Sequence, residues 1–544
     1  MRNRPPNQLF YGDNLDVLRD QIHDESVDLI YLDPPFNSNA GYNVLFRTTK
    51  GQAADASIQA FSDTWKWGEP AQLALDDIRS GANRPLTVMM DAMEAALGQS
   101  PLMAYLAMMA VRFVELHRVL KSTGSIYLHC DPTASHYLKL VLDRVFSPER
   151  YRNEIIWKRT SSHGNVSAGY GDVTDSIFYY TKGANPTWNR PMTPLSEQHV
   201  RAKYNLTDAN GRQYTTRDLR NPGVRPNLHY PYTASNGKTY LPHPNGWSLS
   251  REKMERYDAA GLLHFPRDDN GRLRLKIYLD ERPGRPMQTL WDDIPPLNSQ
   301  AQERLGYPTQ KPRALLERII AASSNPGDMV LDPFCGCGTA VDAAEKLGRQ
   351  WIGIDVTHIA IGMIEDRMRE GYPGIRFETI GVPKDLASAE KLAREDPHQF
   401  QQWVCWQVGG FPRDKKGGDK GVDGWFNYLG SAGRIETGVI SVKAGDNVNP
   451  AMVRDLGQVM TRDKHRFSLF VCKTLPTRGM EQEAASHPLV ETEWGRFPAL
   501  QIVTLANLFL GQKPKLPPLV SPVKKAARVE TRASHQPGAQ GALL

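Results

Sequence analysis

The N-terminal third of the chain alternates short apolar runs with helical patterns. Apolar runs that suit strands lie at 7–11, 27–32, 125–130, 153–159 and 175–183. A helix is expected after the first run, where Leu15 and Leu18 lie three apart, and a longer one from Leu102 to Leu120. The run at 27–32 is almost unbroken, as in a strand buried on both faces. Strands that alternate with helices predict a mostly parallel, doubly wound α/β sheet.

The same pattern returns after residue 312. Residues 313–356 read as helix, turn, strand, glycine-rich loop, helix and strand, with an acid ending the second strand. Apolar segments near 400–410, 421–430 and 437–445 then predict a second, smaller α/β domain.

Between these parts, from about 189 to 291, periodicity is lost and basic residues alternate with aromatic ones. The basic residues are Arg201, Lys203, Arg212, Arg217, Arg220, Arg225, Lys238, Arg272, Arg274 and Lys276, and the aromatic ones are Tyr204, Tyr214, Tyr230, Tyr232, Tyr240 and Trp247. Such a mixture can bind phosphates and stack on bases. A solvated, irregular insertion is the alternative interpretation.

Length and composition narrow the class of protein. A chain of 544 residues is too long for one core, and a net charge of +6 is compatible with a polyanionic partner. No apolar run is long enough to cross a membrane and no signal-peptide core occurs, so we expect a cytoplasmic protein without a membrane partner. The five cysteines form no even disulfide framework, and Cys335-x-Cys337 lacks the downstream pair of a zinc site.

The glycine-rich loop runs from Asp332 to Thr339, and Asp355 ends the next predicted strand. Glycines there let the backbone approach a ligand, and an acid about 20 residues further on holds ribose hydroxyls in dinucleotide-type folds. The loop is not G-x-G-x-x-G, and no basic side chain beside it favours a pyrophosphate. The pattern therefore favours a nucleoside ligand without phosphates, most commonly S-adenosylmethionine (SAM). Tight helix–strand packing is the alternative use of these glycines.

The run at 27–32 ends in Asp33-Pro34-Pro35-Phe36. Methylation of an exocyclic amino group must counter delocalisation of the nitrogen lone pair into the base. Asp33 and the carbonyl of Pro34 could accept both amino hydrogens, because the prolines fix φ and hold that carbonyl in place. Phe36 would stack on a base swung out of the duplex. A plain Pro-Pro turn is the alternative, and the glycine-rich loop downstream argues against it.

The two motifs and their order resemble those of the DNA amino-methyltransferases, which make N6-methyladenine or N4-methylcytosine. In that family the D/N/S-P-P-Y/F motif is catalytic and the F-x-G-x-G-like loop binds SAM. Here the catalytic motif precedes the loop by about 300 residues, with the basic and aromatic region between them. This order is similar to the permuted β-class arrangement and to type III modification subunits.

The resemblance implies a permuted Rossmann-like, SAM-dependent methyltransferase that acts on double-stranded DNA. The catalytic residues it implies are Asp33, Pro34, Pro35 and Phe36. The donor-binding residues it implies are Asp13, Thr309, Lys311, Asp332, Phe334, Gly336, Gly338, Thr339 and Asp355. An acid at the first motif position is more usual for adenine, so N6-adenine is favoured over N4-cytosine. The reaction needs no metal, and the family pattern makes His129, Asp131 and His136 structural or substrate-channel residues.

The C-terminal α/β domain resembles the Mrr-like nucleases of the PD-(D/E)xK class. "GGDKGVDGWF" and "GVISVKAG" supply Asp423 and Lys443 at the matching positions. In that class a carboxylate binds a divalent ion that activates water, so Asp423 is the candidate ligand for Mg²⁺. Ser441 stands where the class has Glu or Gln, which puts cleavage in doubt.

These patterns divide the chain into six parts. They are a catalytic half of the methyltransferase domain (1–188), a target-recognition insertion (189–295), a SAM-binding half (296–375), a linker (376–395), a restriction-endonuclease-like domain (396–514) and a disordered basic tail (515–544). The leading function is a site-specific DNA methyltransferase. A bifunctional restriction–modification enzyme, a catalytically silent DNA-binding protein and a methyltransferase for RNA or protein amides stay as alternatives, and both a monomer and a homodimer stay open.

Overall fold

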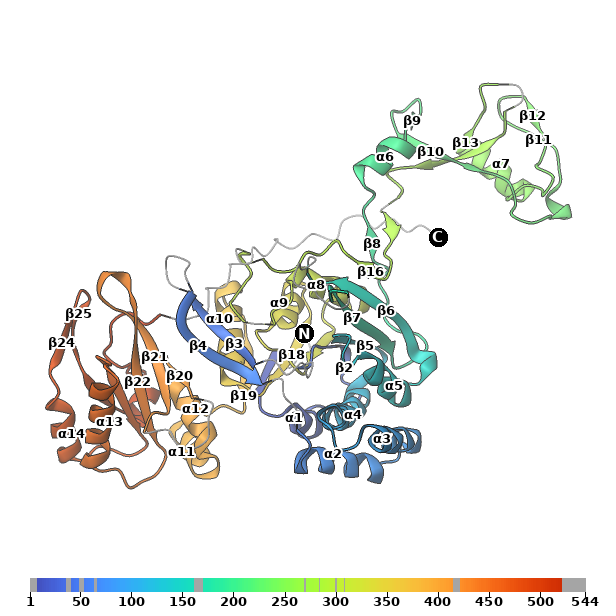
Figure 1. The fold of residues 1–544 in the computed structure, drawn as a ribbon. Helices are drawn as coiled ribbons and strands as arrows, with labels where there is room; N and C mark the ends of the chain where they lie inside the picture. Colours follow the sequence, from blue (N-terminus) through green and yellow to red (C-terminus); the bar gives the residue numbers. More distant parts are fainter. Residues whose placement is uncertain are drawn as a thin grey trace. The chain divides into compact units, whose positions relative to one another are not determined.

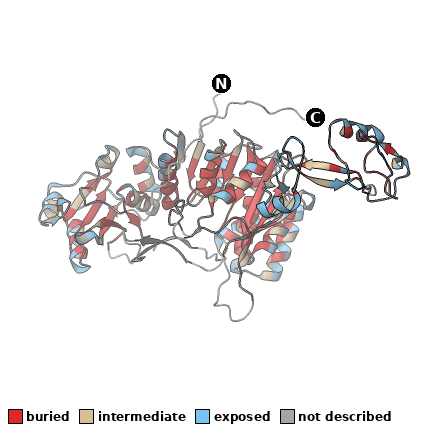
Figure 2. Cartoon of the chain, turned by 90° about the horizontal axis from the view of Figure 1, so that it is seen from above, coloured by how far each residue is buried: buried red, intermediate tan, exposed pale blue. Residues whose placement is uncertain are grey.

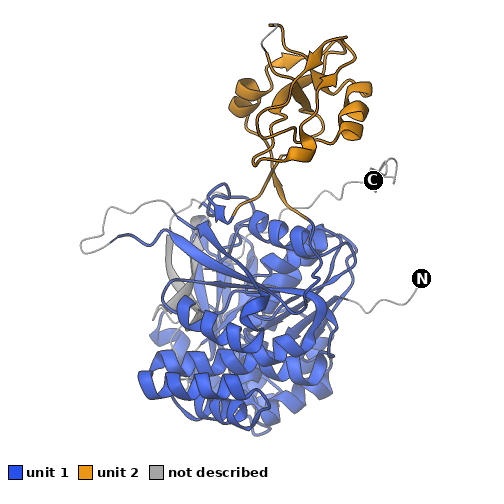
Figure 3. Ribbon diagram, turned by 90° about the vertical axis from the view of Figure 1, so that its right-hand side faces the viewer, with its two compact units in different colours: residues 1–189, 289–544 blue, residues 190–288 orange. Residues whose placement is uncertain are grey.

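The computed structural model describes residues 7–35, 66–160, 170–268, 271–282, 284–298, 301–307, 309–413 and 421–520, together with the backbone of 41–47 and 53–62. The chain forms two compact units, residues 1–189 with 289–544 and residues 190–288 (Figure 3). Within the described part of the chain, none of the helices combines the length and the apolar character that a membrane crossing requires.

A nine-stranded sheet organises the first unit (Figure 1). Its order is β16 (Leu290–Trp291), β6 (Tyr151–Lys158), β7 (Thr174–Thr181), β5 (Leu120–Cys130), β2 (Val27–Leu32), β17 (Met329–Asp332), β18 (Gln350–Asp355), β1 (Asn7–Tyr11) and β19 (Phe377–Ile380). Neighbouring strands pair in parallel, except that β7 is antiparallel to both β5 and β6. The predicted doubly wound, mostly parallel sheet is therefore confirmed.

Helices cover both faces of this sheet. They are α1 (Asn14–Gln21), α4 (Pro101–Val119), α5 (Ser135–Val145), α8 (Arg313–Ser323), α9 (Thr339–Lys346) and α10 (His358–Gly371). α2 (Glu69–Ser80) and α3 (Arg84–Leu97) pack on α4 and α5. Ile126 and Leu128 of β5 join the main core with α1 to α5, whereas Tyr127 between them points to the opposite face and meets Ser323 of α8. All six residues of β2 are buried, as expected of a strand covered on both faces. Figure 2 shows buried residues gathered in the strands at the centre of the chain.

The second unit, Arg190–Gln288, has a small core of its own. Its strands are β8 (Met192–Thr193) with β15 (Arg285–Pro286), β11 (Tyr232–Thr233) with β12 (Thr239–Tyr240), and a sheet of β13 (Leu263–His264), β14 (Arg274–Tyr278), β10 (Gln213–Asp218) and β9 (Leu206–Thr207). Its helices are α6 (Glu197–Lys203) and α7 (Arg251–Ala259). The expectation that its aromatic residues are available for base stacking is wrong for Tyr204, Tyr214, Tyr232, Tyr240 and Trp247, which are buried. These rings supply apolar area that a unit of this size needs to fold.

The C-terminal part of the first unit has a separate five-stranded sheet. Its order is β20 (Phe411–Pro412), β21 (Gly424–Leu429), β22 (Ile435–Lys443), β23 (Ser468–Cys472) and β26 (Leu500–Thr504). The surrounding elements are α12 (Pro397–Gln407), α13 (Pro450–Arg462), α14 (Arg478–Ala485), α15 (Leu505–Phe509) and the hairpin of β24 (Leu489–Thr492) and β25 (Gly495–Pro498). β22, β23 and β26 are parallel, and β21 is antiparallel to β22. This part is α/β, as the sequence predicts. Outside these two sheets, β3 (Gly41–Arg47) and β4 (Ala53–Ser62) form an antiparallel hairpin.

The segment expected to be a linker, 376–395, is instead largely regular structure. β19 adds the edge strand of the large sheet, and α11 (Leu386–Glu395) buries Ala389 and Ala393, four residues apart, in the C-terminal core. Residues 515–520, which were expected to belong to the tail, are described, and the backbone N–H of Val520 donates to the carbonyl of Asn427 of β21. The basic residues Lys524, Lys525, Arg528 and Arg532 lie outside the described residues.

Candidate active site

Four parallel strands end at one edge of the large sheet, and each delivers a candidate site segment there. β1 leads to Asp13, β2 to Asp33, and β17 and β18 end at Asp332 and Asp355. β2 and β17 are neighbours although about 300 residues separate them, and their chains continue to opposite halves of the sheet. Ligands of open α/β sheets bind at the carboxyl ends of strands at such a switch point.

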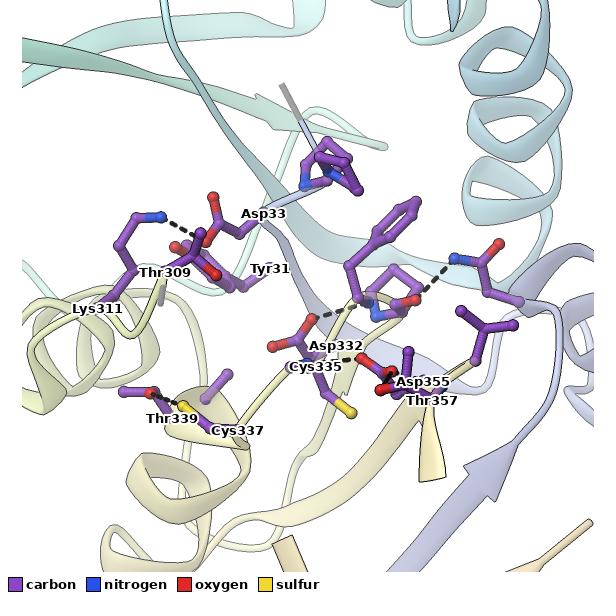
Figure 4. A pocket seen from close by; sticks show the side chains of 18 of the residues that line it. Tyr31, Asp33, Thr309, Lys311, Asp332, Cys335, Cys337, Thr339, Asp355 and Thr357 are labelled. Carbon is purple, nitrogen blue, oxygen red and sulfur yellow. Dashed lines mark hydrogen bonds and ion pairs between the residues drawn. The ribbon is translucent and has the colours of Figure 1, made fainter. Parts of the chain in front are cut away.

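A cavity of about 280 Å³ lies at this edge (Figure 4). The predicted site residues that line it are Asp13, Asp33, Pro34, Pro35, Thr309, Lys311, Asp332, Phe334, Gly336, Thr339 and Asp355. Phe36 lies outside the described residues. Gly338 is not a lining residue; it is the N-cap of α9 in the left-handed conformation and permits the turn that places its neighbours.

Asp33 has one carboxylate oxygen paired and one open. Oδ2 accepts from the ammonium of Lys311 at 2.5 Å, whereas Oδ1 is buried and has no hydrogen-bond donor among the described residues. The side chains of Asp33 and Lys311 are only 15% and 12% exposed. Lys311, which the sequence assigns to the donor-binding group, thus contacts the catalytic candidate directly. A buried acceptor without a donor carries a desolvation cost that a hydrogen-bonding ligand would remove.

The glycine-rich loop is held by Asp355. Its Oδ2 accepts from the backbone of Gly336 at 2.9 Å, and its Oδ1 accepts from the backbone and hydroxyl of Thr357 at 2.9 and 2.8 Å. Burial raises the pKa of Asp355 to about 6 even though these hydrogen bonds lower it. Asp355 lines the cavity, so its carboxylate can also face a hydroxyl of a ligand.

The cavity carries an excess of carboxylates. Its basic side chains in the described lining are Arg112 and Lys311, and both are ion-paired, with Asp13 and Asp33 respectively. Neither Asp332 nor Asp355 has an ion-pair partner within the described ranges. Burial raises the pKa of Asp332 well above its usual value, and the nearby charges of Asp33 and Asp355 raise it further. Such a lining disfavours a phosphate and favours a ligand with a positive centre.

The two loop cysteines are not reactive groups. Burial raises the pKa of Cys335 well above its usual value and also raises that of Cys337. A nucleophilic cysteine needs a stabilised thiolate, so a covalent attack on a base from this loop is disfavoured. Both side chains are buried and act as small packing residues.

Asn14 and Arg112 are lining residues that the sequence analysis missed. Nη2 of Arg112 on α4 donates to both carboxylate oxygens of Asp13 at 2.8 and 2.9 Å, and its Nε donates to Oδ1 of Asn14 at 2.5 Å. Asn14 in turn donates to the carbonyl of Pro333 at 2.7 Å. This chain of contacts connects α4 and α1 to the glycine-rich loop. The helix that contains Arg112 is predicted from its apolar pattern alone. A single arginine within such a pattern does not indicate a site residue.

In the C-terminal sheet, Asp423 and the Ser441–Lys443 segment lie on neighbouring chain segments. The buried carboxylate of Asp423 accepts from the backbone of Val442 at 2.7 Å and from the hydroxyl of Ser441 at 3.4 Å. Among residues that the structure describes, no group of three or more His, Cys, Asp or Glu side chains could hold a metal ion. The predicted nuclease-like residues are thus close together, and the Asp423 carboxylate accepts a hydrogen bond from the backbone near the C-terminal end of β22.

The sheet order and the cavity define an α/β protein with a ligand site at its switch point. Comparison with known proteins gives the family: the chain matches the N6/N4 DNA methylase family over residues 27–366, more than half its length, and belongs to that family. It is 29% identical to the type II methyltransferase M.EcaI of Enterobacter cloacae, over 67% of this chain and 70% of that protein. It is 26% identical to the Mod subunit of the type III restriction-modification enzyme StyLTI of Salmonella typhimurium, over 64% of this chain and 51% of that subunit. It is 25% identical to the DNA adenine methyltransferase YhdJ of Escherichia coli, over 72% of this chain and 93% of that protein.

Proposed function

We propose that this DNA methylase transfers a methyl group from SAM to adenine N6 of a flipped base in double-stranded DNA. The observation that carries the proposal is the open Oδ1 of Asp33, a buried acceptor that lines the same cavity as Pro34 and the glycine-rich loop. An exocyclic amino group is a donor of the kind this acceptor lacks.

SAM fits the residues of the cavity. Gly336 lets the backbone approach a ligand, Phe334 lines the same cavity, and the carboxylate of Asp355 on the cavity wall can accept ribose hydroxyls. The uncompensated carboxylates at Asp332 and Asp355 suit a ligand that carries a sulfonium and an ammonium group. When bound, SAM supplies the methyl group as an electrophile.

The residues of this chain act on the target amine. Asp33 Oδ1 and the Pro34 carbonyl would accept its two hydrogens, which localises the lone pair on nitrogen. Lys311 holds Asp33 by Oδ2, which fixes the direction in which the other oxygen points. Pro35 fixes the turn, and Phe36 is proposed to stack on the flipped base.

Adenine is proposed as the base for two reasons. Asp33 supplies an acid at the first motif position, and the relative YhdJ is named as a DNA adenine methyltransferase. Cytosine N4 is the alternative within the same family. Unit 2, residues 190–288, is proposed to read the target, because its basic side chains at Arg201, Lys203, Arg217, Arg220, Arg225, Lys238, Arg272 and Arg274 are exposed.

The test is methylation of DNA by the purified protein. DNA from an unmethylated host, incubated with the protein and methyl-labelled SAM, should gain label, and sequencing of modified bases should place it on adenine N6 within one recognition sequence. Label on cytosine N4 would correct the base, and label absent from DNA would refute the proposal.

A nuclease activity is a second candidate, supported by the closeness of Asp423 to the Ser441–Lys443 segment. The donor set fits a divalent metal poorly, because Ser441 brings no charge and Asp423 already accepts a backbone N–H. Plasmid DNA incubated with Mg²⁺ or Mn²⁺ should stay intact if the domain has lost cleavage. Site-dependent cuts that need Asp423 would establish a bifunctional restriction–modification enzyme.

A further inference from the structure

A buried chain of hydrogen bonds starts at the cavity wall and crosses three strands. Tyr31, two residues before Asp33 on β2, lines the cavity, and its hydroxyl lies 2.9 Å from Nδ1 of His129 on β5. Nε2 of His129 lies 3.0 Å from Asp175 on β7, and Asp175 also pairs with Arg159 at 3.2 Å. His129 is fully buried and Asp175 is 2% exposed.

The protonation states in this chain are constrained. Burial alone would raise the pKa of Asp175, but the hydrogen bond from His129, the charge of His129 when protonated, and the charges of Lys311 and Arg159 outweigh it, so the pKa lies below its usual value. An ionised carboxylate only accepts, so Nε2 of His129 carries a hydrogen. In the neutral ring Nδ1 then accepts from the Tyr31 hydroxyl. Burial, with the negative charges of Asp33 and Asp332, raises the pKa of Tyr31 well above its usual value, so this hydroxyl stays protonated at rest.

Methylation of an amine on a base creates a positive nitrogen that must lose a proton. Both oxygens of Asp33 already have a role in the proposed transfer, Oδ2 in the ion pair with the ammonium of Lys311 at 2.5 Å and Oδ1 in holding the amine. We propose that His129, oriented by Asp175, is the acceptor of this proton and that the Tyr31 hydroxyl passes it on. This inference rests on the proposed methyl transfer and adds a route for the proton.

The step balances as two coupled transfers. One N–H of the methylated amine turns from the Pro34 carbonyl to the Tyr31 oxygen and breaks as its proton is transferred, and the Tyr31 O–H bond breaks as its proton goes to Nδ1 of His129. Tyr31 is neutral before and after, and the imidazolium that forms is compensated by Asp175. After the product leaves, the same path returns the proton to water in the cavity.

Tyr31→Phe tests the relay, because it removes one hydroxyl and keeps the ring. We expect the single-turnover rate of methyl transfer to fall about 100-fold, the range of general acid–base catalysis. KM for DNA and the Kd for SAM should stay within about threefold, since the ring still lines the cavity. His129→Gln should lose a similar factor, and the double variant should lose no more than either alone, as for residues that act as a unit.

Tyr127→Phe is the matched control. Tyr127 is paired with Tyr31 across the β2–β5 register and its buried hydroxyl bonds to Ser323 at 2.7 Å, outside the relay. It should keep the wild-type rate. If Tyr31→Phe is folded and transfers methyl at the wild-type rate, or loses rate only through KM, the relay is refuted while the methyltransferase stands. If the wild type transfers no methyl, both fail.

Discussion

Lys311→Met is the substitution that separates two roles for this residue, support of Asp33 and binding of the donor. The ion pair with Asp33 spans 2.5 Å between side chains that are 12% and 15% exposed. At an effective dielectric constant of about 20, Coulomb attraction at that distance is roughly 7 kcal/mol. Desolvation of both groups offsets most of it, which leaves about 1.5–3 kcal/mol for a hydrogen bond to a charged group.

If that energy holds the Asp33 carboxylate in its working position, Lys311→Met should lower kcat about 10- to 100-fold, since about 1.4 kcal/mol is worth a factor of ten. The assay is single-turnover transfer from labelled SAM at saturating donor and DNA, with SAM binding measured by calorimetry. SAM affinity should change little, and Lys311→Arg, which keeps the cation, should recover most of the rate. An unchanged rate at saturating SAM, with a large loss of SAM affinity, would refute the role at Asp33 and restore the donor-binding role.

Three further substitutions or conditions test other parts of the site and the fold. Burial raises the pKa of Asp355 to about 6, and the ionised carboxylate is the better acceptor for ribose hydroxyls. SAM affinity should therefore rise with pH up to about 6 and then level off. Asp355→Asn should remove that pH dependence in a calorimetric titration. Gly338→Ala should destabilise the protein by about 1–3 kcal/mol in urea unfolding. The glycine has a positive φ, and a Cβ there would collide with the side chain of Ile364. Equal stability of the variant and the wild type would contradict the strain argued for this turn. Asp423→Ala should cost about 1–3 kcal/mol of stability by leaving the N–H of Val442 without its acceptor, and methyl transfer should persist; a loss of DNA cleavage in this variant would instead reveal a nuclease.

The central sheet could be predicted because its strands are marked locally. The runs that became β1, β2, β5, β17 and β18 are short and apolar and end in a polar turn, which is what burial on both faces requires. β19 escaped detection because it is an edge strand, in which no residue is buried. The aromatic residues of unit 2 were misread because composition does not tell a core tyrosine from an exposed one.

The site could be predicted as a set of residues and not as a set of contacts. Asp33, Asp332 and Asp355 stand at strand ends, and parallel strands bring their carboxyl ends to one edge. The pairing of Lys311 with Asp33 joins residues 278 apart, and the contact of Tyr31 with His129 joins residues 98 apart. Such contacts depend on the packing of loops over the sheet, which leaves no pattern along the chain.

The most direct test of the account is transfer of labelled methyl groups to DNA by the wild type and by Asp33→Ala, with SAM binding measured on both proteins. The wild type should label exocyclic amino groups, and Asp33→Ala should bind SAM almost normally yet lose transfer, because the acceptor for the target amine is gone. Full activity of Asp33→Ala, or no transfer by the wild type to DNA from an unmethylated host, would contradict the role given to the end of β2.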